Sequence, residues 1–345
     1  MSGYPVDESM QSKTVIPDRL RSPLYRLISS WEFLLLFVGV LIFFANTQAS
    51  PYFLDPWNLS DATFNFTEKA MIAFAMALVI ISGEIDLSVA SIIALVSTCM
   101  GFAVQLGFDT PALIFVALTV GALCGAFNGF LVAVLGLPSI VVTIGTLSLF
   151  RGIAYIVLGD KSYSGYPESF AFFGQGYVWW VITFEMVLFA VIALFFYVLL
   201  HRTSFGRSTI AIGNNPTAAL FAGIRVSRVK FILFVLTGIF SAIAAVCLTS
   251  RLGSTRPSIA VGWELEIVTM IVLGGVNILG GSGTIPGVFI AAIVMGMVTF
   301  GLGLLNVPGI VMSIFVGLLL ICVIALPIVL QRARAAQRAR QQVSA

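Results

Sequence analysis

The sequence predicts an all-α integral membrane protein with about ten transmembrane helices. Its 345 residues are 59% hydrophobic and only 10% charged, and the mean hydropathy is +1.07, whereas about 25% of the residues of a soluble domain are charged. Only helices and closed barrels satisfy every backbone polar group in lipid. Because the apolar runs are about twice as long as a barrel strand needs, we expect helices surrounded by lipid.

Ten apolar segments are separated by glycine, proline and charge clusters, which mark the ends of helices. The expected spans are 24–45, 69–83, 86–106, 111–135, 138–159, 177–200, 229–250, 262–279, 284–304 and 308–328. The second and eighth are short, and the junctions at 83–88 and 279–283 are candidates for bends inside the membrane. A polar tail (1–23) precedes the transmembrane domain (24–330), and a basic tail (331–345) follows it.

The distribution of Lys and Arg predicts the orientation. Most of these 18 residues lie before the first span, in the long loop 201–230, or after the last span. Positively charged loops stay in the cytoplasm, so we expect both termini and this loop to be cytoplasmic. Helices 2–5 then start outside and helices 7–10 start inside, which is the arrangement of an inverted repeat.

Enzymatic and metal-binding roles find little support in the sequence. The P-loop pattern G-x-x-x-x-G-K-[ST] does not occur, so the chain is not expected to hydrolyse ATP alone. A single histidine, His201, excludes a multi-histidine metal site, and the four cysteines lie in apolar runs without metal-ligand spacing. We expect no catalytic residue, metal, cofactor or nucleic-acid partner for this chain.

The loop 201–230 predicts a helix of two turns. Asn214 or Asn215 can cap its start, Pro216 suits the first helical position, and Gly223 suits the exit. Such a helix, with glycines on its flank, fits a docking surface for a cytoplasmic partner or an ordinary interfacial helix.

Several polar residues lie near or within the apolar runs. Acids at membrane depth are costly and suggest a function, although Asp86 is also placed to cap the helix that follows it. Asn128 lies in a stripe of glycines that favours close helix packing. The candidates for a substrate path, with interhelical hydrogen bonding as the alternative, are Glu84, Asp86, Asn128, Thr143 and Thr146.

Four stretches make the chain resemble the permease subunits of bacterial ABC sugar importers, the family of the ribose, xylose, rhamnose and autoinducer-2 permeases. They are SGEIDLSVASIIAL (82–95), NGFLVAVLGLPSIVVTIGTLSLFRGIAY (128–155), GRSTIAIGNNPTAALFAGI (206–224) and VLGGVNILGGSGTIPG (272–287). With the helix count, the resemblance covers residues 30–328. The chain departs from the family pattern at Glu84, where members often have glycine, which adds a carboxylate at the first junction.

The resemblance implies an importer in the bacterial inner membrane that works by alternating access. A periplasmic binding protein would deliver a monosaccharide, such as rhamnose, another pentose or deoxyhexose, or autoinducer-2. Two permease chains, identical or paralogous, would form the path. Separate ATPase subunits would bind ATP and magnesium and dock on the coupling loop 201–228. The resemblance places the family's ATPase-contacting residues at Gly206, Arg207, Gly213, Asn214, Asn215, Ala218, Ala219 and Gly223. Arg251 and Arg256, after the seventh helix, are candidates for contact with carboxylates of the binding protein.

Three alternatives remain open. An ion-coupled secondary transporter should carry ionisable groups deep in its spans, whereas those of this chain lie mostly at helix ends. An intramembrane enzyme needs a catalytic cluster. A permease of the related branched-chain amino-acid importers would differ in its substrate and not in its mechanism.

Overall fold

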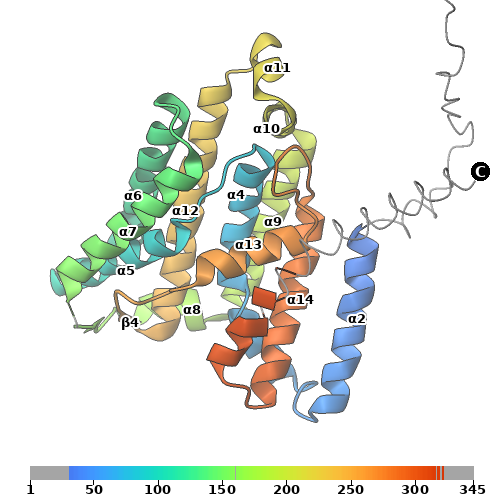
Figure 1. Ribbon diagram of the computed structural model, residues 1–345. Coiled ribbons are helices and arrows are strands. Elements are labelled where there is room, and N and C mark those ends of the chain that lie inside the picture. The colour runs from blue at the N-terminus through green and yellow to red at the C-terminus, as the bar shows by residue number, and fades with distance from the viewer. Residues whose placement is uncertain (1–30, 160, 316, 319–320, 322–345) are drawn as a thin grey trace, which may run out of the picture.

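The structure is a computed structural model, which describes residues 31–159, 161–315, 317–318 and 321. This part of the chain is almost entirely helical (Figure 1). Its helices are α2 (Trp31–Ala49), α3 (Pro56–Phe64), α4 (Thr67–Ile81), α5 (Val89–Gln105), α6 (Thr110–Gly129), η2 (Phe130–Val134), α7 (Ser139–Leu158), η3 (Glu168–Phe170), α8 (Phe172–Gln175), α9 (Phe184–Arg202), α10 (Ser204–Asn214), α11 (Pro216–Phe221), α12 (Val226–Leu252), α13 (Trp263–Leu273) and α14 (Ile285–Leu304).

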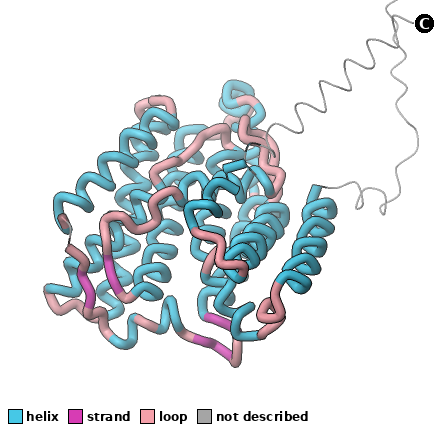
Figure 2. The backbone as a smooth tube through the Cα atoms, turned by 60° about the horizontal axis from the view of Figure 1, so that its bottom comes forward, coloured by secondary structure: helices cyan, strands magenta, loops and turns pink. Residues whose placement is uncertain are grey.

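Within the described residues, four short strands lie in connecting segments. β1 (Tyr163–Ser164) pairs antiparallel with β4 (Ser254–Thr255), and β2 (Tyr177–Trp179) pairs antiparallel with β3 (Ile182–Thr183). We call the end of the bundle that carries β4 and α8 the α8 end, and the opposite end, which carries α10 and α11, the α11 end (Figure 1). Figure 2 shows the strands as short magenta segments among the loops that connect the helices.

The described helices confirm an all-α membrane protein. Six of them are long and apolar enough to cross a membrane, and α3 with α4, bent by 45°, makes a seventh candidate. Each of the first nine predicted spans overlaps a helix, although α5 and α13 are shorter than a full crossing. Residues 309–315 of the tenth span are helical, and the rest of that span lies largely outside the described residues, as do both predicted tails.

The short helices follow from the glycine-rich junctions. α13 has 11 residues, which at 1.5 Å per residue span only about half of a bilayer core. It ends in the segment 274–284, where four glycines adopt positive φ. Gly83 likewise has a φ of 85°, which ends α4. Both junctions flagged in the sequence are therefore nonhelical segments.

α4 and α12 form the centre of the bundle. Every residue of α4 from Ala70 to Ile81 is buried, and α12 packs against α4, α5 and α6. α4 in turn packs against α12, α13 and α14, while the α5–α6 contact has a counterpart in α13–α14. In the predicted repeat, α4, α5 and α6 correspond to α12, α13 and α14, so each of these contacts in one half has an equivalent in the other half. The inverted repeat itself stays a prediction.

The glycine stripe on α6 serves packing, as the sequence indicates. A Cβ added at Gly121 would lie 2.5 Å from the carbonyl oxygen of Gly238 on α12. A Cβ at Gly125 would collide with the carbonyl oxygen of Phe234. Because both obstacles are backbone atoms, α6 and α12 approach each other closely only with glycine at these positions.

Candidate functional site

The predicted helix in the long loop is α11. The Asn215 side-chain oxygen accepts the Ala218 N–H at 2.9 Å, so that Asn215 caps the helix, and Pro216 takes its first position. Gly223 has a φ of 82° at the exit. The helix and its two end signals are confirmed, because both signals act within a few residues.

α10 directly precedes α11 and was not expected from the sequence. Thr203 caps it by accepting the Gly206 N–H at 3.3 Å. Gly206 and Gly213, expected as flanks of the docking helix, lie instead within α10. A side chain at Gly206 would collide with the Leu200 carbonyl, and one at Gly213 would collide with the Ile81 carbonyl. Thr203, a residue type that favours the N-cap position, was the signal available in the sequence.

Hydrogen bonds connect α10 to the junctions in both halves of the chain. The Asn214 side chain donates to the Gly281 carbonyl at 3.1 Å. The Gly281 N–H donates to the Ile81 carbonyl at 2.9 Å. The end of α10, the end of α4 and the segment 274–284 are therefore bonded together at the α11 end.

α11 presents an exposed apolar surface. Leu220 is 60% exposed and Phe221 is 86% exposed. Beside them is a hollow of about 570 Å³ between α11 and the start of α12, lined by Pro216, Thr217, Leu220, Arg225, Val226, Ser227 and Arg228. Leu220 and Phe221 were not among the predicted docking residues. Of those that were, Arg207, Asn214, Asn215, Ala218 and Gly223 are exposed, Gly213 is half-buried, and Gly206 and Ala219 are buried.

Three of the predicted path residues, Asp86, Asn128 and Thr143, gather around the segment 82–88, and Thr146 bonds the Thr143 carbonyl within α7. Asp86 Oδ1 accepts the Ser88 N–H at 2.9 Å and the Ser88 hydroxyl at 2.6 Å. The Asn128 side chain donates to the Ser88 hydroxyl oxygen at 2.8 Å. The Thr143 hydroxyl donates to the Ser139 carbonyl at 2.8 Å and to the Ile85 carbonyl at 3.3 Å, which ties α7 to this segment.

This polar cluster is closed to solvent in the structure. Asp86, Asn128 and Thr143 are 0% exposed, and Thr146 is 4% exposed. Asp86 Oδ2 and Asn128 Oδ1 have no hydrogen-bond partner within the described part of the chain. The expected capping role of Asp86 is wrong: Ser88 is the N-cap residue of α5, and Asp86 accepts only from Ser88 and not from the first-turn N–H groups of the helix. A part in the substrate path stays a prediction for these residues.

Glu84 lies apart from the buried cluster. Its carboxylate forms an ion pair with the Lys230 ammonium at the start of α12. The two side chains are 15% and 18% exposed. Sequence reasoning missed this pairing because the partners are separated by 146 positions.

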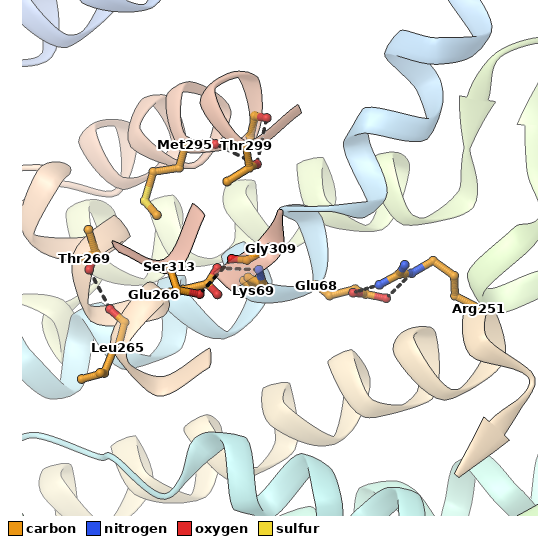
Figure 3. A network of polar contacts seen from close by, with 11 residues as sticks. Glu68, Lys69, Arg251, Leu265, Glu266, Thr269, Met295, Thr299, Gly309 and Ser313 are labelled. Atoms are coloured by element: carbon orange, nitrogen blue, oxygen red, sulfur yellow. Dashed lines mark hydrogen bonds and ion pairs between the residues drawn. The ribbon is translucent and has the colours of Figure 1, made fainter. Parts of the chain in front are cut away.

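Ion pairs also hold the α8 end, where Arg251 is not the free docking side chain expected from the sequence. The Arg251 guanidinium donates from Nε to Glu68 Oε1 at 3.0 Å and from Nη2 to Oε2 at 2.8 Å (Figure 3). Glu68 is 1% exposed, so Arg251 neutralises a buried carboxylate of its own chain. Arg256 is exposed and lines a hollow of about 410 Å³ together with Lys161.

The first three residues of α4 each hold a different helix. Thr67 donates to Glu185 of α9 at 2.9 Å, Glu68 binds Arg251 of α12, and Lys69 pairs with Glu266 of α13 at 2.5 Å. The start of α4 therefore connects three helices that are far apart in the sequence.

Comparison with known proteins gives one family and close relatives. A model of the family described as branched-chain amino acid transport system / permease component matches residues 58–324. The autoinducer 2 import system permease protein LsrD of Enterobacter sp. (strain 638) is 36% identical over 301 residues, covering 86% of this chain and 92% of the relative. The same-named protein of Salmonella typhimurium is 35% identical over 301 residues, covering 86% and 90%. That of Escherichia coli O9:H4 is 35% identical over 305 residues, covering 87% and 92%. No solved structure matches.

Proposed function

Because this chain belongs to the permease-component family of branched-chain amino acid transport systems, we propose that it is the membrane subunit of an ABC importer for autoinducer-2 or a related small sugar. The observation that carries the proposal is the similarity, over most of the chain, to permeases named for autoinducer-2 import. Rhamnose, other deoxyhexoses and pentoses are the alternative substrates. ATP hydrolysis then belongs to a separate ATPase subunit.

The surface of α11 is the proposed contact with that ATPase. Leu220 and Phe221 offer exposed apolar groups, and Arg225 and Arg228 line the neighbouring hollow. Apolar anchors surrounded by charge are typical of a specific protein interface. An ATPase groove with acidic residues would match the two arginines.

The hydrogen bonds behind α11 offer a route by which ATPase movement reaches the spans. α11 follows α10 directly, and α10 is bonded through Asn214 to the segment 274–284, which bonds the end of α4. A displacement of α11 therefore acts on α4 and on the α13–α14 junction together. In an alternating-access cycle, this movement would open the buried cluster around Asp86 to one side of the membrane and then the other.

We assign the α11 end to the cytoplasm and the α8 end to the periplasm, since the long loop carries five positive side chains, Arg202, Arg207, Arg225, Arg228 and Lys230. Both termini are then cytoplasmic in a bacterial inner membrane. A second permease chain, identical or paralogous, would complete the path. The periplasmic binding protein would contact exposed Arg256 and Lys161.

Reconstitution tests the proposal. The chain is placed in proteoliposomes with its ATPase, a second permease chain and a binding protein, and uptake of labelled autoinducer-2, rhamnose and leucine is measured. We expect uptake of autoinducer-2 or rhamnose that requires ATP. ATP-independent uptake driven by a sodium or proton gradient would refute the ABC assignment, and uptake of leucine alone would favour an amino-acid importer.

The docking step has its own matched pair of variants. Phe221→Ser removes an exposed ring of α11, whereas Leu252→Ser removes an exposed apolar side chain at the α8 end. Binding of the ATPase, measured by pull-down with the purified chain, should fall for Phe221→Ser and stay unchanged for Leu252→Ser. Equal binding by both variants would contradict docking on α11.

A further inference from the structure

A cavity at the α8 end lies apart from the Asp86 cluster and from the docking surface. Its volume is about 360 Å³, within the range of roughly 300–1,000 Å³ usual for small-molecule sites. It lies between the α3–α4 turn, α4, α13, the last turns of α14 and the helix that follows. Its polar lining consists of Asn65, Lys69, Glu266, Thr299 and Ser313.

The charges at this cavity cancel. Lys69 and Glu266 form an ion pair and are only 15% and 24% exposed. The Lys69 ammonium also lies 4.9 Å from the centre of the Trp263 ring. Figure 3 shows Lys69 and Glu266 together, close to Ser313. A charged ligand would meet a like charge here and compete with the pair, so a neutral ligand is favoured.

The polar groups still have hydrogen-bonding capacity. The Thr299 hydroxyl donates to the Met295 and Gly296 carbonyls of its own helix, and the Ser313 hydroxyl donates to the Gly309 carbonyl. Both oxygens keep lone pairs that can accept. Glu266 uses only Oε2 in its ion pair.

Donors are present as well. The Lys69 ammonium has three donors and uses one of them toward Glu266. The exposed Asn65 side chain makes no hydrogen bond to the described residues. A ligand that both donates and accepts at several positions, as a polyol does, matches this lining. Phe300, held at 5.8 Å from the Phe53 ring, adds an apolar wall for the C–H face of such a molecule.

We propose that this cavity binds one neutral, polyhydroxylated molecule of monosaccharide size. Its place at the α8 end makes it a holding site for the solute on the periplasmic side, separate from the buried cluster. The role as a holding site rests on the proposed import function, whereas binding of the molecule to the cavity can be measured without transport.

Thiol protection tests the binding directly. Thr299→Cys and Ser313→Cys are made separately in a chain whose four cysteines are replaced by Ala, and the protein is placed in phosphatidylcholine nanodiscs, whose lipid offers no hydroxylated head group. The labelling rate with a small maleimide is measured with D-ribose, L-rhamnose or L-leucine. We expect the sugars to slow labelling at both positions at least five-fold, and leucine to leave it unchanged. Ser258→Cys, which lines other hollows at the same end, should be unprotected.

A second pair of variants links protection to the lining. Asn65→Ala should raise the sugar concentration for half-protection about five-fold, as expected for one lost hydrogen bond. Asn58→Ala is the matched control, because that side chain bonds the Tyr52 carbonyl outside the cavity. Neither change touches the Lys69–Glu266 pair, so folding should be preserved.

The outcomes separate the cavity from the transport function. Absence of sugar protection at both cysteines, in protein that supports ATP-driven uptake, would overturn the holding site and leave the proposed function intact. If the sugars give no protection and labelling slows only when phosphatidylglycerol is added to the nanodiscs, the cavity binds a lipid head group, which would also overturn the inference.

Discussion

Removal of Arg251 should destabilise the protein strongly, because Glu68 would remain buried without a counter-charge. Glu68 is 1% exposed, and its two oxygens accept both hydrogen bonds of the Arg251 fork. Breaking one partner of a buried ion pair costs roughly 3–5 kcal/mol. Arg251 is 27% exposed, so we expect the lower limit, about 3 kcal/mol, for Arg251→Met.

Thermal unfolding of the detergent-solubilised protein measures this effect. With an unfolding entropy of about 2.1 cal/mol/K per residue, about 3 kcal/mol corresponds to a fall in Tm of about 4 °C for a chain of 345 residues. Arg256→Met is the control, because Arg256 is exposed and should change stability by less than about 0.5 kcal/mol. The double variant Glu68→Gln/Arg251→Met removes both charges and should recover most of the loss.

Two results would refute the reasoning. If Arg251→Met melts at the same temperature as Arg256→Met, the Glu68–Arg251 pair does not hold α4 to α12. If the double variant is no more stable than Arg251→Met, the loss comes from packing of the arginine stem and not from an unpaired carboxylate.

Three further predictions concern packing, coupling and alkaline stability. Gly125→Ala should cost about 1–3 kcal/mol in thermal unfolding, because the new Cβ meets the Phe234 carbonyl, whereas Gly145→Ala, with open space around it, should be neutral or slightly stabilising. Gly223→Val, or the change of both Asn215 and Pro216 to Gly, should destabilise α11 by about 1 kcal/mol per helix end. Sugar uptake and ATPase stimulation should then fall while Tm stays unchanged. Normal uptake would exclude α11 as the coupling element. Burial raises the pKa of Tyr166, in the loop between α7 and α9, to about 12 from 10.0, so the stability that its neutral hydroxyl contributes is complete below pH 10 and is lost as the pH rises toward 12. The Tm of Tyr166→Phe should therefore fall less than that of the unmodified protein between pH 10 and pH 12. An identical fall in Tm would contradict the burial of this hydroxyl.

Local signals explain why the helices were predictable. An apolar run of about 20 residues indicates a transmembrane helix, whichever other helices it packs against. The caps of α11 act over one turn, so that Asn215, Pro216 and Gly223 predict its ends without reference to the rest of the chain. The glycine stripe on α6 predicts a close helix contact for the same reason, although it does not identify α12 as the partner.

The sequence by itself determined the membrane class, the positions of the spans and the exposed helix α11, because hydropathy and helix caps are properties of neighbouring residues. Only the tertiary structure decided which polar groups meet. Glu68 and Arg251 are 183 positions apart and Glu84 and Lys230 are 146 apart, and nothing local to either partner specifies the other. Gly206 and Gly213 were expected at a helix flank, whereas both lie inside α10, where a side chain at either position would collide with a backbone carbonyl. Arg251 likewise changed from a candidate docking side chain to the counter-charge of a buried acid, because burial depends on how the helices assemble.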